Sequence, residues 1–199
     1  AVVSRGLGDV YKRQTQTIIE QVATMQKLVQ AFSDYANTPE VELVPTQLNN
    51  LITNITEMYQ DPNADWQVTR DLDDSCTKVL ADSSRLRQLL HNLIKNALEA
   101  TEETQNSVIH VRSLCDYPDW LTLTVCDNGP GIPEEAQNWI FEPYATDKPK
   151  GTGLGLAVVR KIVEEHYGQI SLDSSPESGT CFICLLYTSD AADDIRWVA

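Results

Sequence analysis

Two glycine-rich segments that lie close together constrain the fold more than any other feature of the chain. The first, Asp-Asn-Gly-Pro-Gly-Ile, occupies residues 127–132, and the second, Lys-Pro-Lys-Gly-Thr-Gly-Leu-Gly-Leu, occupies residues 148–156. The second segment runs directly into a stretch whose apolar residues recur with helical spacing. Glycine lets the backbone approach a ligand closely, and the first turn of a helix offers unpaired N–H groups to phosphate. Together the two segments indicate a nucleotide site.

A polar stripe precedes both loops. Asn92, Asn96 and Glu99 stand at i, i+4 and i+7 of an expected helix, on the side opposite its leucines. The amide oxygen of Asn96 is the kind of hard ligand that Mg²⁺ takes, with phosphates and water completing its shell. A solvated helix face would explain the stripe if it stood alone. The two downstream loops favour a metal and phosphate site instead.

These segments resemble the nucleotide-binding boxes of sensor histidine kinases. Residues 91–100 are similar to the N box, 127–131 to the G1 box, 141–144 to the F box and 151–155 to the G2 box, in the family's order and spacing. The resemblance covers residues 15–186 and is strongest to nitrogen-regulation sensors of the NtrY/NtrB kind. It implies an ATP-binding catalytic module that uses Mg²⁺, a homodimeric parent protein and relay of the phosphate to a response regulator.

The resemblance also implies roles for the matching residues. Asn96 matches the Mg²⁺ ligand, Asn92 and Lys95 match residues near the phosphates, and Asp127 matches the carboxylate that accepts a hydrogen bond from the adenine amine. The expected catalytic residues are Asn96, Asn92 and Lys148. The other expected nucleotide contacts are Gly129, Gly131, Ile132, Phe141, Tyr144, Lys150, Gly151, Thr152, Gly153, Leu154, Gly155 and Thr180.

The segment between the loops, which the resemblance identifies as a lid, contains residues with two possible roles. Lys148 is expected to reach the γ-phosphate, with Lys150 as its substitute, but either is as readily an ordinary surface lysine. Phe141 and Tyr144 match aromatic residues of the lid and can equally be core residues. Asp147 departs from the family's usual threonine, and its charge is unfavourable beside a triphosphate.

Apolar periodicity predicts an α+β fold. We expect helices over residues 15–36, 48–58, 83–101, 134–140 and 154–167, with Asp82 as an N-cap and Gly168 as a C-terminal stop. We expect strands over residues 41–44, 66–72, 77–80, 108–114, 120–126, 170–173 and 180–186. Helices and strands in mixed order are typical of a two-layer α/β sandwich. The resemblance identifies it with the histidine-kinase, gyrase and chaperone ATPase type.

The chain divides into four expected segments. Residues 15–38 are the second helix of a dimerisation and phosphotransfer hairpin, and residues 39–186 are the ATP-binding domain. Residues 1–14 and 187–199 fit no part of the pattern, and we interpret them as non-native ends. The first helix carries a heptad seam that favours a partner helix, although such a helix can also pack on its own domain. The seam is formed by Ile18, Val22, Met25, Val29, Phe32 and Ala36.

Charge and composition exclude other classes of function. The net charge of −14 argues against binding to nucleic acid or to an anionic membrane. No run of 18 apolar residues is present, so we expect no direct membrane contact by this fragment and a cytoplasmic location, with upstream segments free to attach the parent to the inner membrane. The five cysteines lack metal-site spacing, and Cys181 and Cys184 would face opposite sides of a strand. We therefore expect buried thiols in a reducing compartment.

The chain lacks a plausible phosphoacceptor. None of His91, His110 and His166 has the sequence context of the family's acceptor histidine, so the γ-phosphoryl group of ATP is expected to pass to a segment outside this chain. The alternatives are a non-catalytic pseudokinase module, an ATP hydrolase and a serine kinase of the same fold. Hydrolases of the fold carry a glutamate where this chain has Asn92, which cannot act as a base. The helix over residues 15–36 counts against the serine kinases.

Overall fold

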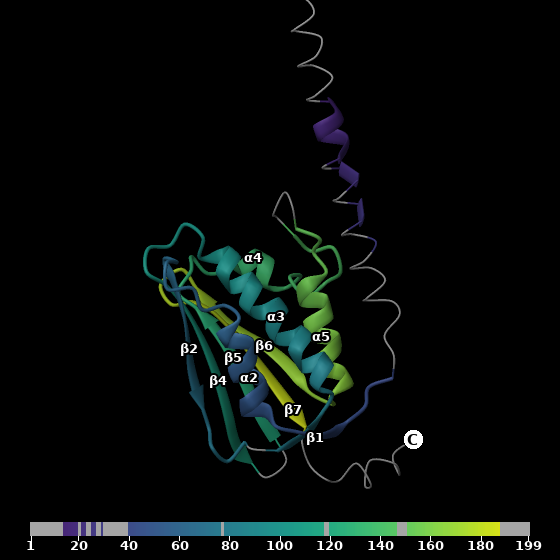
Figure 1. Ribbon diagram of the computed structural model, residues 1–199, viewed down its shortest axis with the longest axis vertical. Helices are drawn as coiled ribbons and strands as arrows, with labels where there is room; N and C mark the ends of the chain where they lie inside the picture. The colour runs from purple at the N-terminus through teal and green to yellow at the C-terminus, as the bar shows by residue number, and fades with distance from the viewer. Residues whose placement is uncertain are drawn as a thin grey trace, which may run out of the picture.

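A sheet and a set of helices form the two layers of the fold (Figure 1). The computed structural model describes residues 14–19, 21–22, 25–26, 29, 40–76, 78–117, 120–146 and 151–187. Its elements are β1 (Val44–Thr46), α2 (Leu48–Glu57), β2 (Trp66–Leu72), β3 (Val79–Ala81), α3 (Ser83–Ala100), β4 (Ser107–Tyr117), β5 (Trp120–Asp127), α4 (Glu134–Gln137), α5 (Gly155–Glu165), β6 (Gln169–Ser175) and β7 (Gly179–Tyr187). The expected two-layer α+β sandwich is confirmed.

The main sheet is mixed, with β5 at its centre. Its order is β2-β4-β5-β7-β6, where β2 and β4 run parallel and every other neighbouring pair is antiparallel. A separate small sheet joins β1 to β3. The pairing of β5 with β7 sets Asp127 directly opposite Thr180 at one end of the sheet. Two residues of the expected site are therefore neighbours because of strand register, although 53 positions separate their residue numbers.

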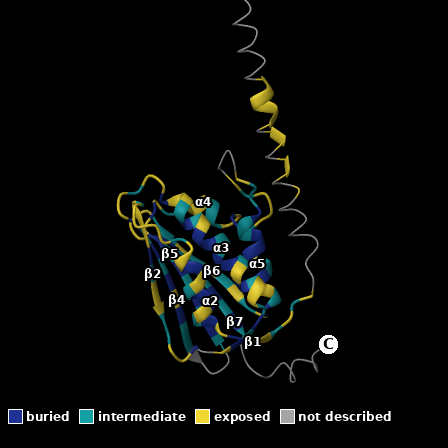
Figure 2. Ribbon diagram, viewed as in Figure 1, coloured by how far each residue is buried: buried dark blue, intermediate teal, exposed yellow. Residues whose placement is uncertain are grey.

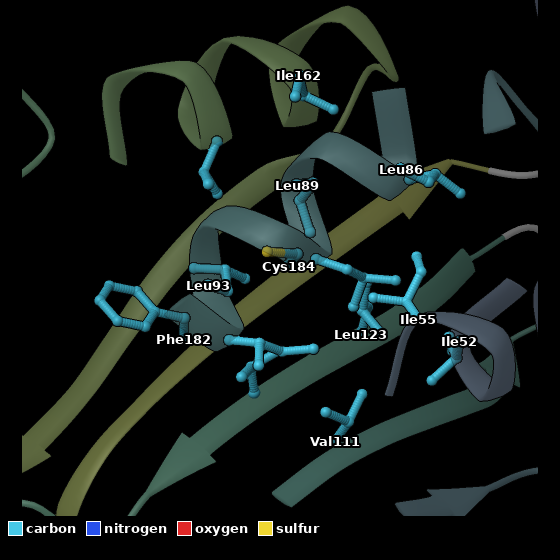
Figure 3. Close-up of a cluster of buried hydrophobic side chains, with 14 of the residues drawn as sticks. Ile52, Ile55, Leu86, Leu89, Leu93, Val111, Leu123, Ile162, Phe182 and Cys184 are labelled. Carbon is cyan, nitrogen blue, oxygen red and sulfur yellow. The ribbon is translucent and has the colours of Figure 1, made fainter. Parts of the chain in front are cut away.

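The core lies between the sheet and the helices α2, α3 and α5 (Figures 2 and 3). Burial alternates strictly along β5, so that every second residue faces the helices. Four of the five leucines of α3 recur at helical spacing and are fully buried. The α3 leucines with no exposed surface are Leu86, Leu89, Leu90 and Leu93. Because α3 contacts both α5 and β5, its register fixes which polar residues remain on its outer side.

The start of α3 and the end of α5 are joined by a buried histidine. Asp82 is the N-cap of α3 and accepts hydrogen bonds from the backbone N–H groups of Ser84 and Arg85, as predicted. His166, the C-cap of α5, accepts from the Asp82 backbone N–H at Nε2 (3.1 Å) and lies 2.8 Å through Nδ1 from the Ile162 carbonyl. This pattern requires the neutral ring with its proton on Nδ1. Burial lowers the pKa of His166 accordingly.

The end of α5 differs in detail from the prediction. Gly168 was expected to stop the helix, but the residue in the left-handed conformation is Tyr167, with φ of 54°. The Gly168 and Tyr167 N–H groups close the turn on the carbonyls of Val163 and Glu164. Glycine is needed at 168 for a different reason, since a Cβ there would lie 2.1 Å from the Leu185 carbonyl oxygen.

Some element boundaries also differ from the prediction. The first strand covers Val44–Thr46 rather than residues 41–44, because Thr46 pairs with Val79 and its hydroxyl donates to the Ala81 carbonyl. The helix expected over residues 134–140 ends at Gln137 and continues as turns. Strand β7 extends to Tyr187, whose ring packs edge-on against Trp120.

The prediction of free thiols is wrong for four of the five cysteines. Cys76 is bonded to Cys115 and Cys126 to Cys181, while Cys184 is the free one. Cys126 and Cys181 are direct partners across β5 and β7, a proximity that the sequence spacing hides. Cys181 and Cys184 do face opposite sides of the strand, as expected. Burial raises the pKa of the Cys184 thiol to about 12.

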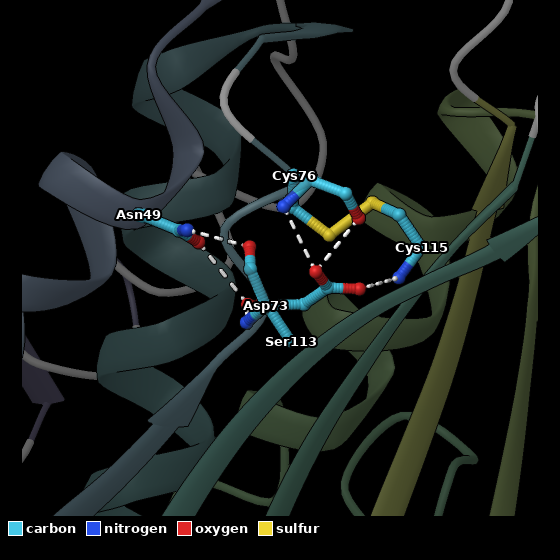
Figure 4. Close-up of a disulfide and its surroundings, with 6 residues drawn as sticks. Asn49, Asp73, Cys76, Ser113 and Cys115 are labelled. Atoms are coloured by element: carbon cyan, nitrogen blue, oxygen red, sulfur yellow. Dashed lines mark hydrogen bonds between the residues drawn. A yellow bond between two sulfur atoms is a disulfide. The ribbon is translucent and has the colours of Figure 1, made fainter.

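The other disulfide lies beside an aspartate that organises the turn after β2 (Figure 4). Asp73 Oδ1 accepts from the backbone N–H and the hydroxyl of Ser75, and Oδ2 accepts from the Cys115 N–H at 3.1 Å. These hydrogen bonds, the Ser75 side chain first, lower the pKa of Asp73. Asn49 of α2 donates to the Asp73 carbonyl, which ties the turn to the helix layer.

The described residues among 14–29 are helical and exposed. Ile18, Val22, Met25 and Val29 have exposed fractions between 48% and 69%. The alternative interpretation, a helix packed on its own domain, requires these positions to be buried. They are exposed instead. Phe32 and Ala36 lie outside the described residues. No helix in the described part of the chain is long and apolar enough to cross a bilayer.

Candidate functional site

Two amide side chains of α3 face the start of α5. A Cβ built on Gly155 would lie 3.8 Å from Asn92 Oδ1 and 3.9 Å from both Asn96 Oδ1 and Asn96 Nδ2. Leu154, the N-cap of α5, provides no side-chain hydrogen bond to the first turn of that helix. The first-turn N–H groups and the positive end of the helix dipole therefore suit an anion beside the two amides.

The residues at this position fit a magnesium ion that arrives with phosphates. Asn96 offers an amide oxygen, a hard ligand that Mg²⁺ accepts, and the ion commonly takes only one or two protein ligands when phosphates supply the others. Among the described residues there is no group of three or more histidine, cysteine, aspartate or glutamate side chains that could hold a metal. Asn96 could thus supply one oxygen ligand to such an ion, and the N–H groups at the helix start could receive its phosphates.

Lys95 stands apart from this pair of amides. Its ammonium lies 3.8 Å from Glu99 Oε1 on the surface of α3, and its side chain is 70% exposed. The prediction that Lys95 lies near phosphates receives no support from this ion pair. Exposed pairs of this kind contribute little to stability, so the lysine remains available to turn toward a ligand.

A second cluster surrounds Asp127 at the end of β5. Asp127 is 6% exposed, and Thr180, its partner on β7, is 3% exposed. The Gly129 N–H donates to Asp127 Oδ1 at 2.9 Å, and a Cβ at Gly129 would lie only 2.8 Å from the same oxygen. A side chain at 129 would therefore displace the Asp127 carboxylate or the loop that returns onto it.

The loop after Asp127 is fixed on both sides. Asn128 accepts from the Val108 N–H at 2.8 Å and donates to the Asn106 carbonyl at 3.0 Å, which anchors the loop to the start of β4. Gly131 has φ of 75°, and a Cβ there would lie 2.5 Å from the Ser175 carbonyl oxygen. The first glycine-rich segment is thus held between β4 and the turn from β6 to β7.

The lid aromatics do not share one environment. Phe141 packs against the core and contacts the ring of Phe182 edge-on, with 6.1 Å between ring centroids. Tyr144 is 59% exposed and has φ of 67°. Phe141 is therefore a core aromatic in this structure, which was one of the two alternatives, and Tyr144 is not.

The second glycine-rich segment rests on the backbone of the lid. Gly153 has φ of 65°, and a Cβ there would lie 2.4 Å from the Tyr144 carbonyl carbon. The Leu154 N–H lies 3.4 Å from the Thr152 hydroxyl, and Leu154 itself is buried. Gly151 is described, whereas the predicted lysines Lys148 and Lys150 lie outside the described residues.

Helix α3 connects the two clusters. Asn92 and Asn96 lie beside α5, and the Ala100 carbonyl at the end of the same helix would be 3.3 Å from a Cβ on Gly129. One turn of helix between Asn96 and Ala100 separates the clusters by about 6 Å along the axis. The two clusters are therefore close enough for one ligand to contact both.

Three residues of this arrangement were not predicted from the sequence. Asn128 is the loop anchor, Ser174 on β6 accepts from the Ile132 N–H at 2.8 Å, and Gly179 has φ of 78° with no room for a Cβ beside the Asp127 carbonyl oxygen. The sequence does place Gly179 directly before Thr180, an expected nucleotide contact, and this position could have marked Gly179 as part of the site. Nothing in the sequence distinguishes Ser174 from its neighbours.

Comparison with known proteins gives one consistent result. Residues 81–189 match the family described as histidine kinase-, DNA gyrase B-, and HSP90-like ATPase. The sensory histidine kinase/phosphatase NtrB of Rhodobacter capsulatus is 32% identical over an alignment of 188 residues, and the match covers 88% of this chain and 52% of that protein. The chain thus spans about half the length of this relative.

Solved structures agree with the sequence comparison. The catalytic domain of histidine kinase ThkA is 35% identical, with a TM-score of 0.66 over 74% of this chain and 98% of that domain. ThkA in complex with the response regulator protein TrrA is 28% identical, with a TM-score of 0.72 over 88% of this chain and 51% of that one.

Proposed function

This chain belongs to the family of histidine kinase-, DNA gyrase B-, and HSP90-like ATPases, and we propose that it is the ATP-binding catalytic module of a two-component sensor histidine kinase. The module holds Mg·ATP and donates the γ-phosphoryl group to a histidine of a hairpin outside this chain. The observation that carries the proposal is the position of Asn92 and Asn96 against the start of α5.

The base end of ATP lies at the first glycine-rich loop in this proposal. Asp127 accepts a hydrogen bond from the exocyclic amine of adenine, and Thr180 lies beside it. Both residues are nearly fully buried. A base that failed to pair with them would forgo hydrogen bonds to buried groups, so the two residues contribute to selectivity as well as to affinity.

The phosphate end lies between α3 and α5. N–H groups at the start of α5 and the amide of Asn92 receive phosphate oxygens, and Asn96 is the metal ligand. Bound Mg²⁺ would neutralise phosphate charge and hold the oxygens in place. Lys148, with Lys150 as its substitute, is proposed to reach the γ-phosphate from the lid.

Phosphoryl transfer then needs positioning and charge stabilisation more than acid–base chemistry. A neutral imidazole nitrogen forms a bond to the γ-phosphorus while the bond from that phosphorus to the bridging oxygen breaks, and ADP leaves with the electron pair. The amide of Asn92 stands where a hydrolase needs a carboxylate, and an amide cannot take a proton from water. Slow ATP hydrolysis without an acceptor is expected.

The partners follow from the same proposal. The likeness to ThkA, which has been solved with the response regulator TrrA, supports relay of the phosphate to a response regulator. The exposed apolar residues between Ile18 and Val29 support homodimerisation of the parent through this helix. The net charge of −14 supports a module that does not bind nucleic acid. We place the module in the cytoplasm.

Phosphotransfer to a supplied acceptor tests the proposal. The chain is mixed with the separately produced dimerisation hairpin of the Rhodobacter capsulatus relative, γ-labelled ATP and Mg²⁺. That relative's own catalytic domain serves as the positive control. The expected product is an acid-labile, base-stable phosphate on the hairpin histidine, formed by the native chain and not by a folded Asn96→Ala variant.

Two results would contradict the proposal. Release of free phosphate at a rate independent of the hairpin would indicate an ATP hydrolase. Absence of transfer by a native chain that still binds ATP, while the positive control works, would indicate a non-catalytic binding module.

A further inference from the structure

Ser174 on β6 is the centre of a hydrogen-bond cluster that joins the first glycine-rich loop to the hairpin formed by β6 and β7. Its Oγ accepts from the Ile132 N–H at 2.8 Å. The same oxygen lies 3.1 Å from the Gly179 carbonyl oxygen and 3.0 Å from Thr180 Oγ1. Thr180 is buried directly across from Asp127. Ser174 therefore contacts the side chain next to the expected base.

Counting hydrogens assigns a direction to each of these contacts. A serine hydroxyl has one hydrogen to donate and two lone pairs to accept. The Gly179 carbonyl can only accept, so the Ser174 hydrogen goes to it. The Ile132 N–H occupies one lone pair of Ser174 Oγ, and the other accepts the hydroxyl hydrogen of Thr180. Thr180 Oγ1 is then an acceptor toward any further partner.

The cluster is also held in place from the helix layer. Gln137 of α4 donates to the Ile132 carbonyl at 2.9 Å and to the Ser174 carbonyl at 3.3 Å. The side-chain amide of Gln137 therefore bonds to both residues of the contact between Ile132 and Ser174. This arrangement holds the backbone of Ile132 close to that of Ser174.

We propose that Ser174 is a positioning residue that sets nucleotide specificity, because it fixes the Thr180 hydroxyl as a second hydrogen-bond acceptor beside the Asp127 carboxylate. Two adjacent acceptors match the two hydrogens of an exocyclic amine such as that of adenine. A purine without the amine offers no donor to either acceptor and so forms two fewer hydrogen bonds, which lowers its affinity. The inference rests on the proposed nucleotide-binding function and adds a residue that determines its selectivity.

A pair of nucleotides that differ only in the amine tests this role. ATP and purine riboside 5′-triphosphate, which lacks the 6-amino group, are titrated into each variant, and the ratio of their dissociation constants measures discrimination for the amine. Ser174→Ala should lower this ratio about three- to tenfold, the value of one hydrogen bond. Thr180→Val should lower it by a similar factor. In the Thr180→Val background, Ser174→Ala should cause no further loss.

Two further variants separate positioning from general damage. Ser174→Thr keeps the hydroxyl and should keep the discrimination. Ser178→Ala removes an exposed hydroxyl of the same hairpin that lies 2.7 Å from the Ser175 hydroxyl, and it should change neither constant. Loss of the contact with Ile132 could weaken the binding of both nucleotides equally. Such a loss cancels in the ratio of the two dissociation constants.

The inference is overturned if Ser174→Ala weakens both nucleotides equally, or if its effect on the ratio adds fully to that of Thr180→Val. Should Ser174→Ala fail to fold, Ser174→Thr with lost discrimination would overturn it as well. A native chain that binds neither nucleotide overturns the proposed function itself. A native chain that binds ATP with an unchanged ratio across the variants overturns only the role of Ser174.

Discussion

Gly155→Ala should separate binding from stability at the phosphate end of the site. Gly155 is the first residue of α5, and the nearest side-chain atoms to a Cβ there are those of Asn92 and Asn96, at 3.8 and 3.9 Å. These are ordinary contact distances, so the methyl group fits in the free protein. Alanine also favours a helix over glycine by up to about 1 kcal/mol. We expect unchanged or slightly higher stability.

Binding should respond in the opposite direction. The added methyl occupies the space between the two amides and the N–H groups at the start of α5, where the phosphates are proposed to lie. Loss of one such phosphate contact costs about 1.5–3 kcal/mol, since the acceptor is charged. The dissociation constant for Mg·ATP should therefore rise at least about tenfold.

Thermal unfolding and calorimetric titration measure the two effects on the same sample. Gly153→Ala is the matched control, because its Cβ would lie 2.4 Å from the Tyr144 carbonyl carbon and its φ is 65°. That variant should lose stability, by about 1–2 kcal/mol from the backbone conformation alone. Native affinity for Mg·ATP in a folded Gly155→Ala variant would refute the placement of the phosphates.

The remaining predictions concern stability. Burial lowers the pKa of His166 from 6.5, so the contribution of the neutral ring to the free energy of unfolding is present above pH 6.5 and is lost as the pH falls below that value. His166→Gln should therefore make the melting temperature less dependent on pH between about pH 7 and 5. Hydrogen bonds lower the pKa of Asp73 from 3.8, so the contribution of its carboxylate to the free energy of unfolding is lost as the pH falls through the pKa of the folded state. Asp73→Asn should therefore reduce the loss of stability in acid, measured as the unfolding midpoint. Replacing Cys126 and Cys181 by serine opens a loop with a sequence separation of 55 and should lower the free energy of unfolding by up to about 4 kcal/mol in denaturant titrations.

Local sequence signals were sufficient for the elements that define the fold. The periodic leucines of α3 predicted its buried side, and Asp82 predicted its first turn, because both depend on residues within one helix. The two glycine-rich segments predicted where loops approach a ligand. Gly131 and Gly153 do have positive φ values, and added Cβ atoms would overlap backbone at both.

Features that depend on contacts between distant segments were not accessible from local signals. The bond between Cys126 and Cys181 follows from the register of β5 with β7, and the sequence spacing alone suggested free thiols. The role of Ser174 depends on the return of the first glycine-rich loop to β6. Gly168 was identified correctly as the residue at the end of α5. Glycine is needed there, however, because the carbonyl of Leu185 on β7 leaves no room for a Cβ.

Calorimetric titration of the native chain with a non-hydrolysable ATP analogue, with and without Mg²⁺, is the decisive measurement for the proposed nucleotide site. The same titration is repeated with Asp127→Ala after its fold has been verified by circular dichroism. We expect binding that is strengthened by Mg²⁺ and is lost in the variant. A folded native chain that does not bind the analogue, or a variant that binds it as tightly as the native chain, would contradict the proposed site.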